Sequence, residues 1–270
     1  MTTNELERGR WNDEHWVAAW PKRERMTDAV TAFVLDAAAL RSGERVLDVG
    51  CGGGHTSLAA AQAVGAEGAV VGGDISTQLT TLAQSRAAEA GVANVEFNAV
   101  DMQVDQVAGG PFDVAISQFG VMFFDEPQTA FANIRAHLRP GGRLAFACWQ
   151  PVECNAWFFG RAIASLVPPP PPPAPGKSPT GPFSLADPEQ TTALLRAAGF
   201  EEVQCSPHEL AVDVPRDAVV DVAQLAFLGV SAENLDAAET AVNDYMEQFA
   251  VGGEQLRLPL AFQVFEAVNP

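Results

Sequence analysis

The strongest constraint on the fold is a short stretch at residues 45–56, which reads RVLDVGCGGGHT. Its aliphatic beginning predicts a parallel strand that is buried on both faces. The glycine-rich turn that follows allows tight backbone dihedral angles and a close approach by a ligand. A helix that begins directly after the turn would point its free N–H groups at that ligand. The stretch therefore predicts a site for a nucleotide-like molecule.

The rest of the chain alternates between apolar runs of strand length and stretches of helical periodicity. Ser76 is a candidate helix N-cap, and the sequence Asp187-Pro188-Glu189 predicts a helix start with proline in the first turn. This alternation predicts an α/β fold with a doubly wound, seven-stranded and mostly parallel sheet, to which helical lid additions are attached. The expected strands are 46–49, 69–74, 95–97, 112–117, 143–149, 201–214 and 257–267.

We expect residues 1–270 to form a single domain with additions to a cofactor-binding core at 27–150. Residues 1–26 are polar and rich in tryptophan, which suits either a surface helix or a lid over a pocket. A proline-rich connection spans 167–186, and its unbroken run at 168–173 predicts a polyproline II spacer, a rim of the site or a ligand for a proline-binding partner. A helical insertion is expected at 216–252, before the last strand.

Composition disfavours several kinds of partner. The net charge of −18, from 34 acidic and 16 basic residues, repels phosphate backbones and anionic lipid surfaces, so neither a nucleic acid nor a membrane is expected. The four cysteines have no C-x-x-C spacing, which predicts reduced thiols and no metal site. With no apolar leader and no apolar run of spanning length, the chain is expected to be cytoplasmic. The oligomeric state stays open, a homodimer included.

The glycine turn fits neither of two common nucleotide motifs. His55 stands where a dinucleotide-binding G-x-G-x-x-G turn has its third glycine, and no Lys-Ser or Lys-Thr follows for a P-loop. An acid, Asp48, precedes the turn instead. A carboxylate there suits a ligand with an ammonium group better than a pyrophosphate.

Four motifs in the expected order then resemble one family. The segment 48–54 (DVGCGGG) resembles motif I of the class I S-adenosylmethionine-dependent methyltransferases, and Asp74 ends the second expected strand. Asp101 and Met102 follow the third strand, and the turn 138–142 (LRPGG) resembles the family's LxPGG turn before the fifth strand. The resemblance covers residues 45–149 and implies a Rossmann-like methyltransferase fold with S-adenosyl-L-methionine as cofactor. Within the family, the ubiquinone/menaquinone-type small-molecule subgroup is the most similar.

The resemblance also implies roles for single residues. Asp74 would accept hydrogen bonds from both ribose hydroxyls, although capping the next helix is its competing role. Asp101 would meet the adenine amino group and Met102 would cover the ring, while Asp48 would reach the methionine ammonium or only hold the loop. The expected cofactor-binding residues are Asp48, Gly50, Cys51, Gly52, Gly54, Asp74, Ile75, Asp101, Met102, Ser117 and Gln118.

The acceptor is less well specified. No Asn-Pro-Pro-Tyr or Asp-Pro-Pro-Tyr sequence follows the fourth strand, which argues against nucleic-acid and protein-glutamine acceptors. Aromatic residues outside the core suggest a small, apolar or aromatic acceptor under an aromatic lid, with core packing as the competing role for the phenylalanines. His15, which lies among the N-terminal tryptophans, is the leading candidate for a general base. The expected substrate-contacting residues are Trp11, Trp16, Phe119, Phe123 and Tyr245.

The sequence therefore favours transfer of the sulfonium methyl group to an oxygen, carbon or nitrogen atom of a small molecule by in-line displacement. A cofactor-binding partner or regulator of the same fold without transfer activity is the alternative. A nicotinamide oxidoreductase is disfavoured by Asp48 and His55.

Overall fold

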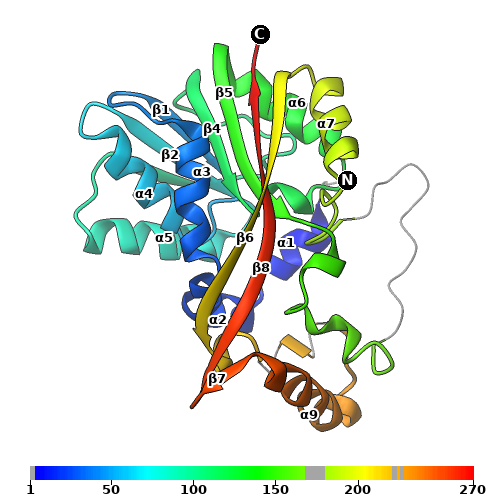
Figure 1. Ribbon diagram of the computed structural model, residues 1–270. Coiled ribbons are helices and arrows are strands. Elements are labelled where there is room, and N and C mark those ends of the chain that lie inside the picture. The colour runs from blue at the N-terminus through cyan, green and yellow to red at the C-terminus, as the bar shows by residue number, and fades with distance from the viewer. Residues whose placement is uncertain (1–3, 168–179, 221–223, 226–227) are drawn as a thin grey trace.

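A computed structural model describes residues 4–167, 180–220, 224–225 and 228–270, except for the side chains of Leu6 and His15 (Figure 1). The strands are β1 (Arg45–Val49), β2 (Ala69–Asp74), β3 (Val95–Ala99), β4 (Phe112–Gln118), β5 (Leu138–Trp149), β6 (Glu201–Pro215), β7 (Ala250–Gly252) and β8 (Gln255–Val268). The α-helices are α1 (Glu5–Trp11), α2 (Glu14–Arg23), α3 (Thr31–Ala38), α4 (His55–Val64), α5 (Thr77–Glu89), α6 (Pro127–His137), α7 (Pro188–Ala197) and α9 (Leu235–Met246).

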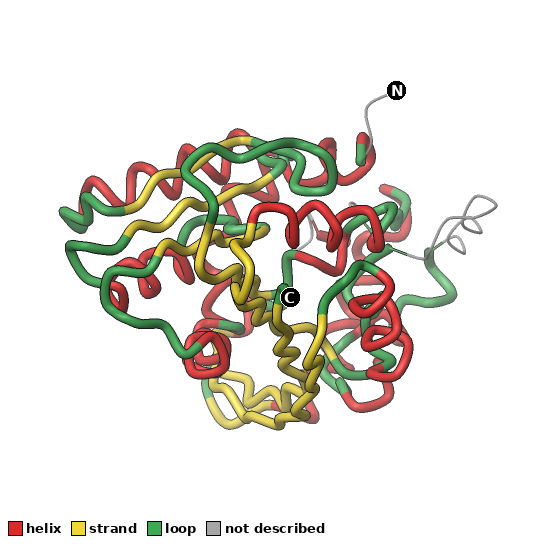
Figure 2. The backbone as a smooth tube through the Cα atoms, turned by 90° about the horizontal axis from the view of Figure 1, so that it is seen from above, coloured by secondary structure: helices red, strands yellow, loops and turns green. Residues whose placement is uncertain are grey.

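The strands form one sheet in the order β3-β2-β1-β4-β5-β8-β6, and β7 pairs only with β8. Neighbouring strands from β3 to β5 are parallel, whereas β8 is antiparallel to both β5 and β6. Helices lie on both faces of this sheet (Figure 2). The chain order reverses between β1 and β4, so the carboxyl ends of these two strands border the crevice in which such sheets bind ligands.

Two helices begin where the sequence predicts, and each has a side-chain N-cap. Ser76 Oγ accepts a hydrogen bond from the Leu79 N–H at 3.1 Å and begins α5. Asp187 Oδ1 accepts from the Glu189 N–H at 2.9 Å, and Pro188 occupies the first turn of α7. Each side chain satisfies a backbone donor that the helix itself leaves unpaired.

The sheet is confirmed as seven-stranded and mostly parallel, with β7 as a short addition. The helical insertion is different from expectation: in the described part of 216–252, α9 is accompanied by short 3₁₀ turns and by β7, and some of the range lies outside the described residues. The proline run at 168–173 also lies outside them. In Figure 1, β6 and β8 extend as a long antiparallel ribbon toward β7 and α9.

An aromatic cluster at the contact between β5 and β8 forms part of the core. Phe146 lies opposite Phe265 in the strand register, and their rings stack with centroids 5.1 Å apart. Phe131 of α6 packs on Phe146 from the helical layer, at 5.5 Å between centroids. All three side chains are fully buried. The antiparallel strand is thereby bound to the parallel part of the sheet by apolar packing as well as by its hydrogen bonds.

We expect Phe265→Ala to lower the free energy of unfolding by about 3–5 kcal/mol, because it removes a buried ring and leaves a cavity. Urea denaturation followed by circular dichroism measures this change. Val251→Ala is the control, since Val251 is 48% exposed and its truncation should change stability by less than about 0.5 kcal/mol. Equal effects of the two substitutions would contradict the assignment of the core.

Candidate functional site

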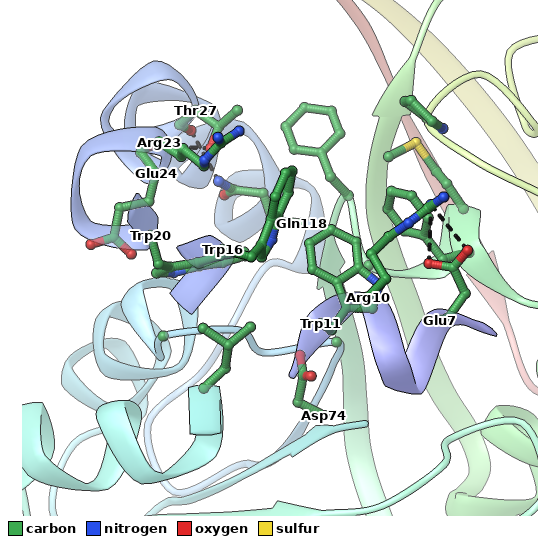
Figure 3. Close-up of a pocket in the computed structure, with 18 of the residues that line it drawn as sticks. Glu7, Arg10, Trp11, Trp16, Trp20, Arg23, Glu24, Thr27, Asp74 and Gln118 are labelled. Atoms are coloured by element: carbon green, nitrogen blue, oxygen red, sulfur yellow. Dashed lines mark hydrogen bonds and ion pairs between the residues drawn. The ribbon is translucent and has the colours of Figure 1, made fainter. Parts of the chain in front are cut away.

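A cavity of about 490 Å³ lies where the sheet order reverses. Its walls come from the turn after β1, from the ends of β2 and β4, and from the N-terminal segment, which we define as residues 4–26. Residues of the 149–159 stretch and of 180–182 close the other side. Figure 3 shows Trp11, Trp16 and Trp20 of the N-terminal segment next to one another, across from Asp74. The cavity is therefore shared between the core and the added segment.

The glycine turn makes close backbone contacts possible. Gly50 has a φ of +70°, in the left-handed region that side chains other than glycine rarely adopt. A Cβ atom at this position would lie 2.7 Å from the Cα atom of Gly120, which follows β4. Glycine at position 50 is thus required both by its dihedral angle and by the contact between the ends of β1 and β4.

Asp74, at the end of β2, has a carboxylate that is already oriented by backbone donors. Its Oδ2 atom accepts from the Gly52 N–H at 2.8 Å and its Oδ1 atom from the Ser76 N–H at 2.9 Å. The residue is 8% exposed and lines the cavity. Burial raises the pKa of this carboxyl, and the backbone donors oppose the rise. A fixed carboxylate with lone pairs left over suits a ligand that carries hydroxyl donors.

Asp101 connects the core to the N-terminal segment. Its Oδ1 atom accepts from the side-chain amide of Asn4 at 3.0 Å and from the Gln103 N–H at 3.0 Å. The Asn4 side chain in turn accepts from the Asp125 N–H at 3.0 Å. Asp101 and its neighbour Met102 are both buried and line the cavity. The start of the N-terminal segment is therefore hydrogen-bonded across the end of β3.

Asp48 is buried beneath the turn and does not line the cavity. Ser57 Oγ donates to its Oδ2 atom at 2.6 Å, while its Oδ1 atom has no hydrogen-bond partner within the described chain. Burial raises the pKa of Asp48 to about 7, the Asp74 charge adds to the rise, and the Ser57 hydrogen bond opposes it.

Cys51 lies within the turn, is 7% exposed and lines the cavity. Burial is the main cause that raises the pKa of its thiol well above the usual value, and the Asp74 and Asp48 carboxylates add to the rise.

Most of the expected cofactor residues converge on this cavity. Gly50, Cys51, Asp74, Ile75, Asp101, Met102 and Gln118 line it. Asp48, Gly52, Gly54 and Ser117 do not line it, although the Gly52 N–H donates to Asp74, which does. Ser117, for example, is fully buried and donates to the Val49 carbonyl at 2.6 Å.

The aromatic residues divide in the same way. Trp11, Trp16, Phe119 and Phe123 line the cavity, and Trp11 contacts both Trp16 and Phe123 edge-on, with centroids 5.2 and 5.0 Å apart. Tyr245 does not line the cavity, and its hydroxyl donates to the Ala156 carbonyl at 2.7 Å. The side chain of His15, in α2, is outside the described part of the structure.

Sequence reasoning missed the charged residues of the N-terminal segment. Arg10 forms an ion pair with Glu7 at 3.0 Å, and the Arg23 guanidinium lies 4.1 Å from the centre of the Trp16 ring. Burial raises the pKa of Glu7, and Arg10 opposes this rise. The i, i+3 spacing of Glu7 and Arg10 was the available signal for their pairing.

Within the described residues, no group of three or more His, Cys, Asp or Glu side chains could hold a metal ion. Over the same part of the chain, we find no helix with the length and apolar character needed to span a membrane.

We expect the stability difference between the wild type and Asp48→Asn to change with pH. The pKa of Asp48 is about 7 in the folded protein and about 4 in an unfolded chain, so the folded state holds the proton more tightly. Wild-type stability should fall as pH rises between these values, whereas the Asn side chain does not titrate. The difference should change by at most about 4 kcal/mol over this range. Urea denaturation of both proteins from pH 5 to pH 8 measures it, and parallel pH profiles would contradict the assignment.

Comparisons with known proteins agree with this geometry. Residues 46–142 match the family model described as a methyltransferase domain. The nocamycin O-methyltransferase of Saccharothrix syringae is 31% identical over 200 residues, which are 69% of this chain and 69% of that protein. The aklanonic acid methyltransferase of Streptomyces sp. (strain C5) is 35% identical over 105 residues, or 39% of this chain and 48% of that protein. The chain spans about half the length of several curated relatives.

The fold also agrees with solved structures. The phosphoethanolamine N-methyltransferase 2 of Haemonchus contortus, in complex with S-adenosyl-L-methionine, gives a TM-score of 0.55 at 16% identity and covers 90% of this chain and 52% of that one. The [4+2]-cyclase SpnF gives a TM-score of 0.56 at 25% identity and covers 90% and 81%. Together with the sequence relatives and the cavity, these matches show that the chain belongs to the class I S-adenosylmethionine-dependent methyltransferases.

Proposed function

We propose that this protein transfers the methyl group of S-adenosyl-L-methionine to an oxygen, carbon or nitrogen atom of a small, largely apolar or aromatic acceptor. The observation that carries the proposal is the Asp74 carboxylate, which two backbone N–H groups orient and which lines the cavity. The opposite wall of this cavity is formed by aromatic side chains. The relatives named for small-molecule methylation support it. Placement in the ubiquinone/menaquinone-type subgroup stays a prediction.

The residues present fit the cofactor. Asp74 offers acceptor lone pairs for two ribose hydroxyls, and Asp101 and Met102 lie at the end of β3, where an adenine ring would be held. Gly50 lets the ends of β1 and β4 approach each other beside the cavity, because a Cβ atom there would clash with Gly120. When bound, S-adenosyl-L-methionine supplies an electrophilic methyl group on a sulfonium sulfur.

The chain's main contribution to the reaction would be positioning. An in-line displacement needs the acceptor held close and collinear in a site from which water is excluded. Phe119 and Trp149 stack with centroids 4.1 Å apart, and Trp149 contacts Trp157 at 5.0 Å. These rings and Trp11 across from them would form the walls of the acceptor site, with the N-terminal segment as its lid.

A proton acceptor is needed only when the attacking atom must lose a proton. His15 stays a prediction for this role. A second candidate is His55, which lines the cavity with its Nε2 atom 3.8 Å from Asp28 Oδ1. Burial raises the pKa of the Asp28 carboxyl, and the nearby His55 opposes this rise.

Two alternatives use the same site differently. One is a cofactor-binding partner or regulator without transfer activity. The other is a reaction other than methyl transfer, which the similarity to the [4+2]-cyclase SpnF favours. Neither changes the expected occupant of the cofactor site.

We expect Asp74→Asn to weaken binding of S-adenosylhomocysteine by about 100-fold, because charged acceptors of hydrogen bonds contribute about 1.5–3 kcal/mol each. Isothermal titration calorimetry measures the dissociation constant. Asp213→Asn is the matched control, since it makes the same charge change at an exposed ion pair with Arg257. Unchanged affinity in Asp74→Asn would remove Asp74 from the cofactor site.

We also expect label from methyl-labelled S-adenosyl-L-methionine to appear in at least one member of a panel of quinols, phenols and aromatic polyketide acids. Mass spectrometry of the products identifies the atom that is methylated. Binding of S-adenosylhomocysteine without any transfer, by a protein of normal stability, would favour the two alternatives over the proposed reaction.

A further inference from the structure

Trp20, near the end of α2, lies directly on the glycine turn. A Cβ atom on Gly52 would lie 2.4 Å from Trp20 Cζ2, and one on Gly53 would lie 2.6 Å from Trp20 Nε1. Gly53, unlike its neighbours Gly52 and Gly54, does not have a positive φ. Its backbone therefore does not require glycine. What the missing side chain provides is room for Trp20 and for Arg86, whose Nη1 atom would lie 2.7 Å from that Cβ atom.

A clamp lies four residues further along, between Glu24 and Arg86. Arg86 of α5 donates to both carboxylate oxygens of Glu24, at 2.9 and 2.6 Å. The same guanidinium donates to the Gly53 carbonyl at 2.9 Å. Both side chains are mostly buried, with exposures of 22% for Arg86 and 16% for Glu24. The clamp thus joins the end of the N-terminal segment to the turn that Trp20 covers.

The indole N–H of Trp20 is buried and has no hydrogen-bond partner within the described residues, although Trp20 lines the cavity. A buried donor left without an acceptor costs free energy, so such a group in a binding site is a candidate for contact with the ligand. Trp11 is different, because Glu7 already accepts a hydrogen bond from its side chain.

The neighbouring Asp74 carboxylate indicates which ligand atom could accept a hydrogen bond from the Trp20 indole N–H. Trp20 covers Gly52, whose N–H is already used by Asp74. A ribose whose two hydroxyls donate to Asp74 still has oxygen lone pairs without donors. An indole nitrogen donates only, so it complements those lone pairs.

We infer that Trp20 is a cofactor-binding residue, whose indole N–H donates to a ribose hydroxyl oxygen on the side opposite Asp74, and that Glu24 and Arg86 are positioning residues for it. The inference rests on the proposed function, because it needs an adenosine-containing ligand in the cavity.

The test is calorimetric titration of Trp20→Phe with S-adenosylhomocysteine and, separately, with adenosine. Phe keeps a ring against Gly52 and removes only the donor. We expect both ligands to bind about three- to tenfold more weakly, as for one neutral hydrogen bond. Tyr245→Phe is the control, because it also removes one donor and keeps a ring, and the Tyr245 hydroxyl donates to the Ala156 carbonyl away from the cavity. Its affinity for both ligands should match that of the wild type.

Each other outcome overturns the inference in a recognisable way. A loss for S-adenosylhomocysteine alone would place the donor at the carboxylate of the amino-acid part, and no loss for either ligand would remove Trp20 from the site. If the wild type itself bound neither ligand, the proposed function would fail, not merely the role of Trp20.

Two further measurements separate this role from a structural one. Glu24→Gln should weaken adenosine binding in the wild type but have little further effect in Trp20→Phe, because it acts through Trp20. Additive losses would contradict that coupling. In ¹⁵N-labelled protein, the indole N–H resonance that Trp20→Phe removes should shift when adenosine binds, and an unmoved resonance would overturn the inference even if the variant folds poorly.

Discussion

The hydrogen bond from the Gly52 N–H to Asp74 Oδ2 joins the turn after β1 to the end of β2. It fixes the carboxylate that faces the cavity and the backbone of the turn at the same time. Strand order alone would bring β1 and β2 side by side, but not hold a charged group at a defined angle. Since the carboxylate is buried, its backbone donors also compensate part of the cost of desolvation. The proposed cofactor site therefore depends on a contact between two loops that a parallel pair of strands makes adjacent.

The N-terminal segment is attached to this site at several separate points. Asn4 is bonded to Asp101 and Glu24 to Arg86. Between them, Asn12 Oδ1 accepts from the Thr77 N–H at the start of α5, at 3.0 Å. Thr77 and Arg86 belong to α5, and Asp101 lies in the loop after β3. A segment with little sequence signal of its own thereby becomes a wall of the cavity.

Much of the fold was predictable, because its signals are local. The run at 46–49, the turn at 50–54 and the helix starts at Ser76 and Asp187 each depend on neighbouring residues. The acids at the ends of β2 and β3 converge because parallel strands end at the same edge of a sheet. Contacts between distant residues were not predictable in this way: the clamp between Glu24 and Arg86 carries no pattern in either segment.

Single polar side chains were harder still. His137, at the end of α6, is buried, and its Nε2 atom accepts from the Val107 N–H at 2.9 Å. Tyr245 was expected at the substrate, and its hydroxyl donates to a carbonyl outside the cavity instead. In both cases a side-chain group, an imidazole nitrogen or a phenol hydroxyl, forms a hydrogen bond with a backbone atom of a distant residue. A spacing pattern in the sequence does not reveal such a bond.

Cys51 has a consequence for the chemical durability of such an enzyme. The proposed occupant of this pocket is an alkylating agent, so a sulfur nucleophile in its wall is a hazard, since self-alkylation would end turnover. The reactive species is the thiolate, not the thiol. Burial and the two nearby carboxylates hold this sulfur in its protonated form. The same acidic residues that would select the ligand thus also protect the wall from it.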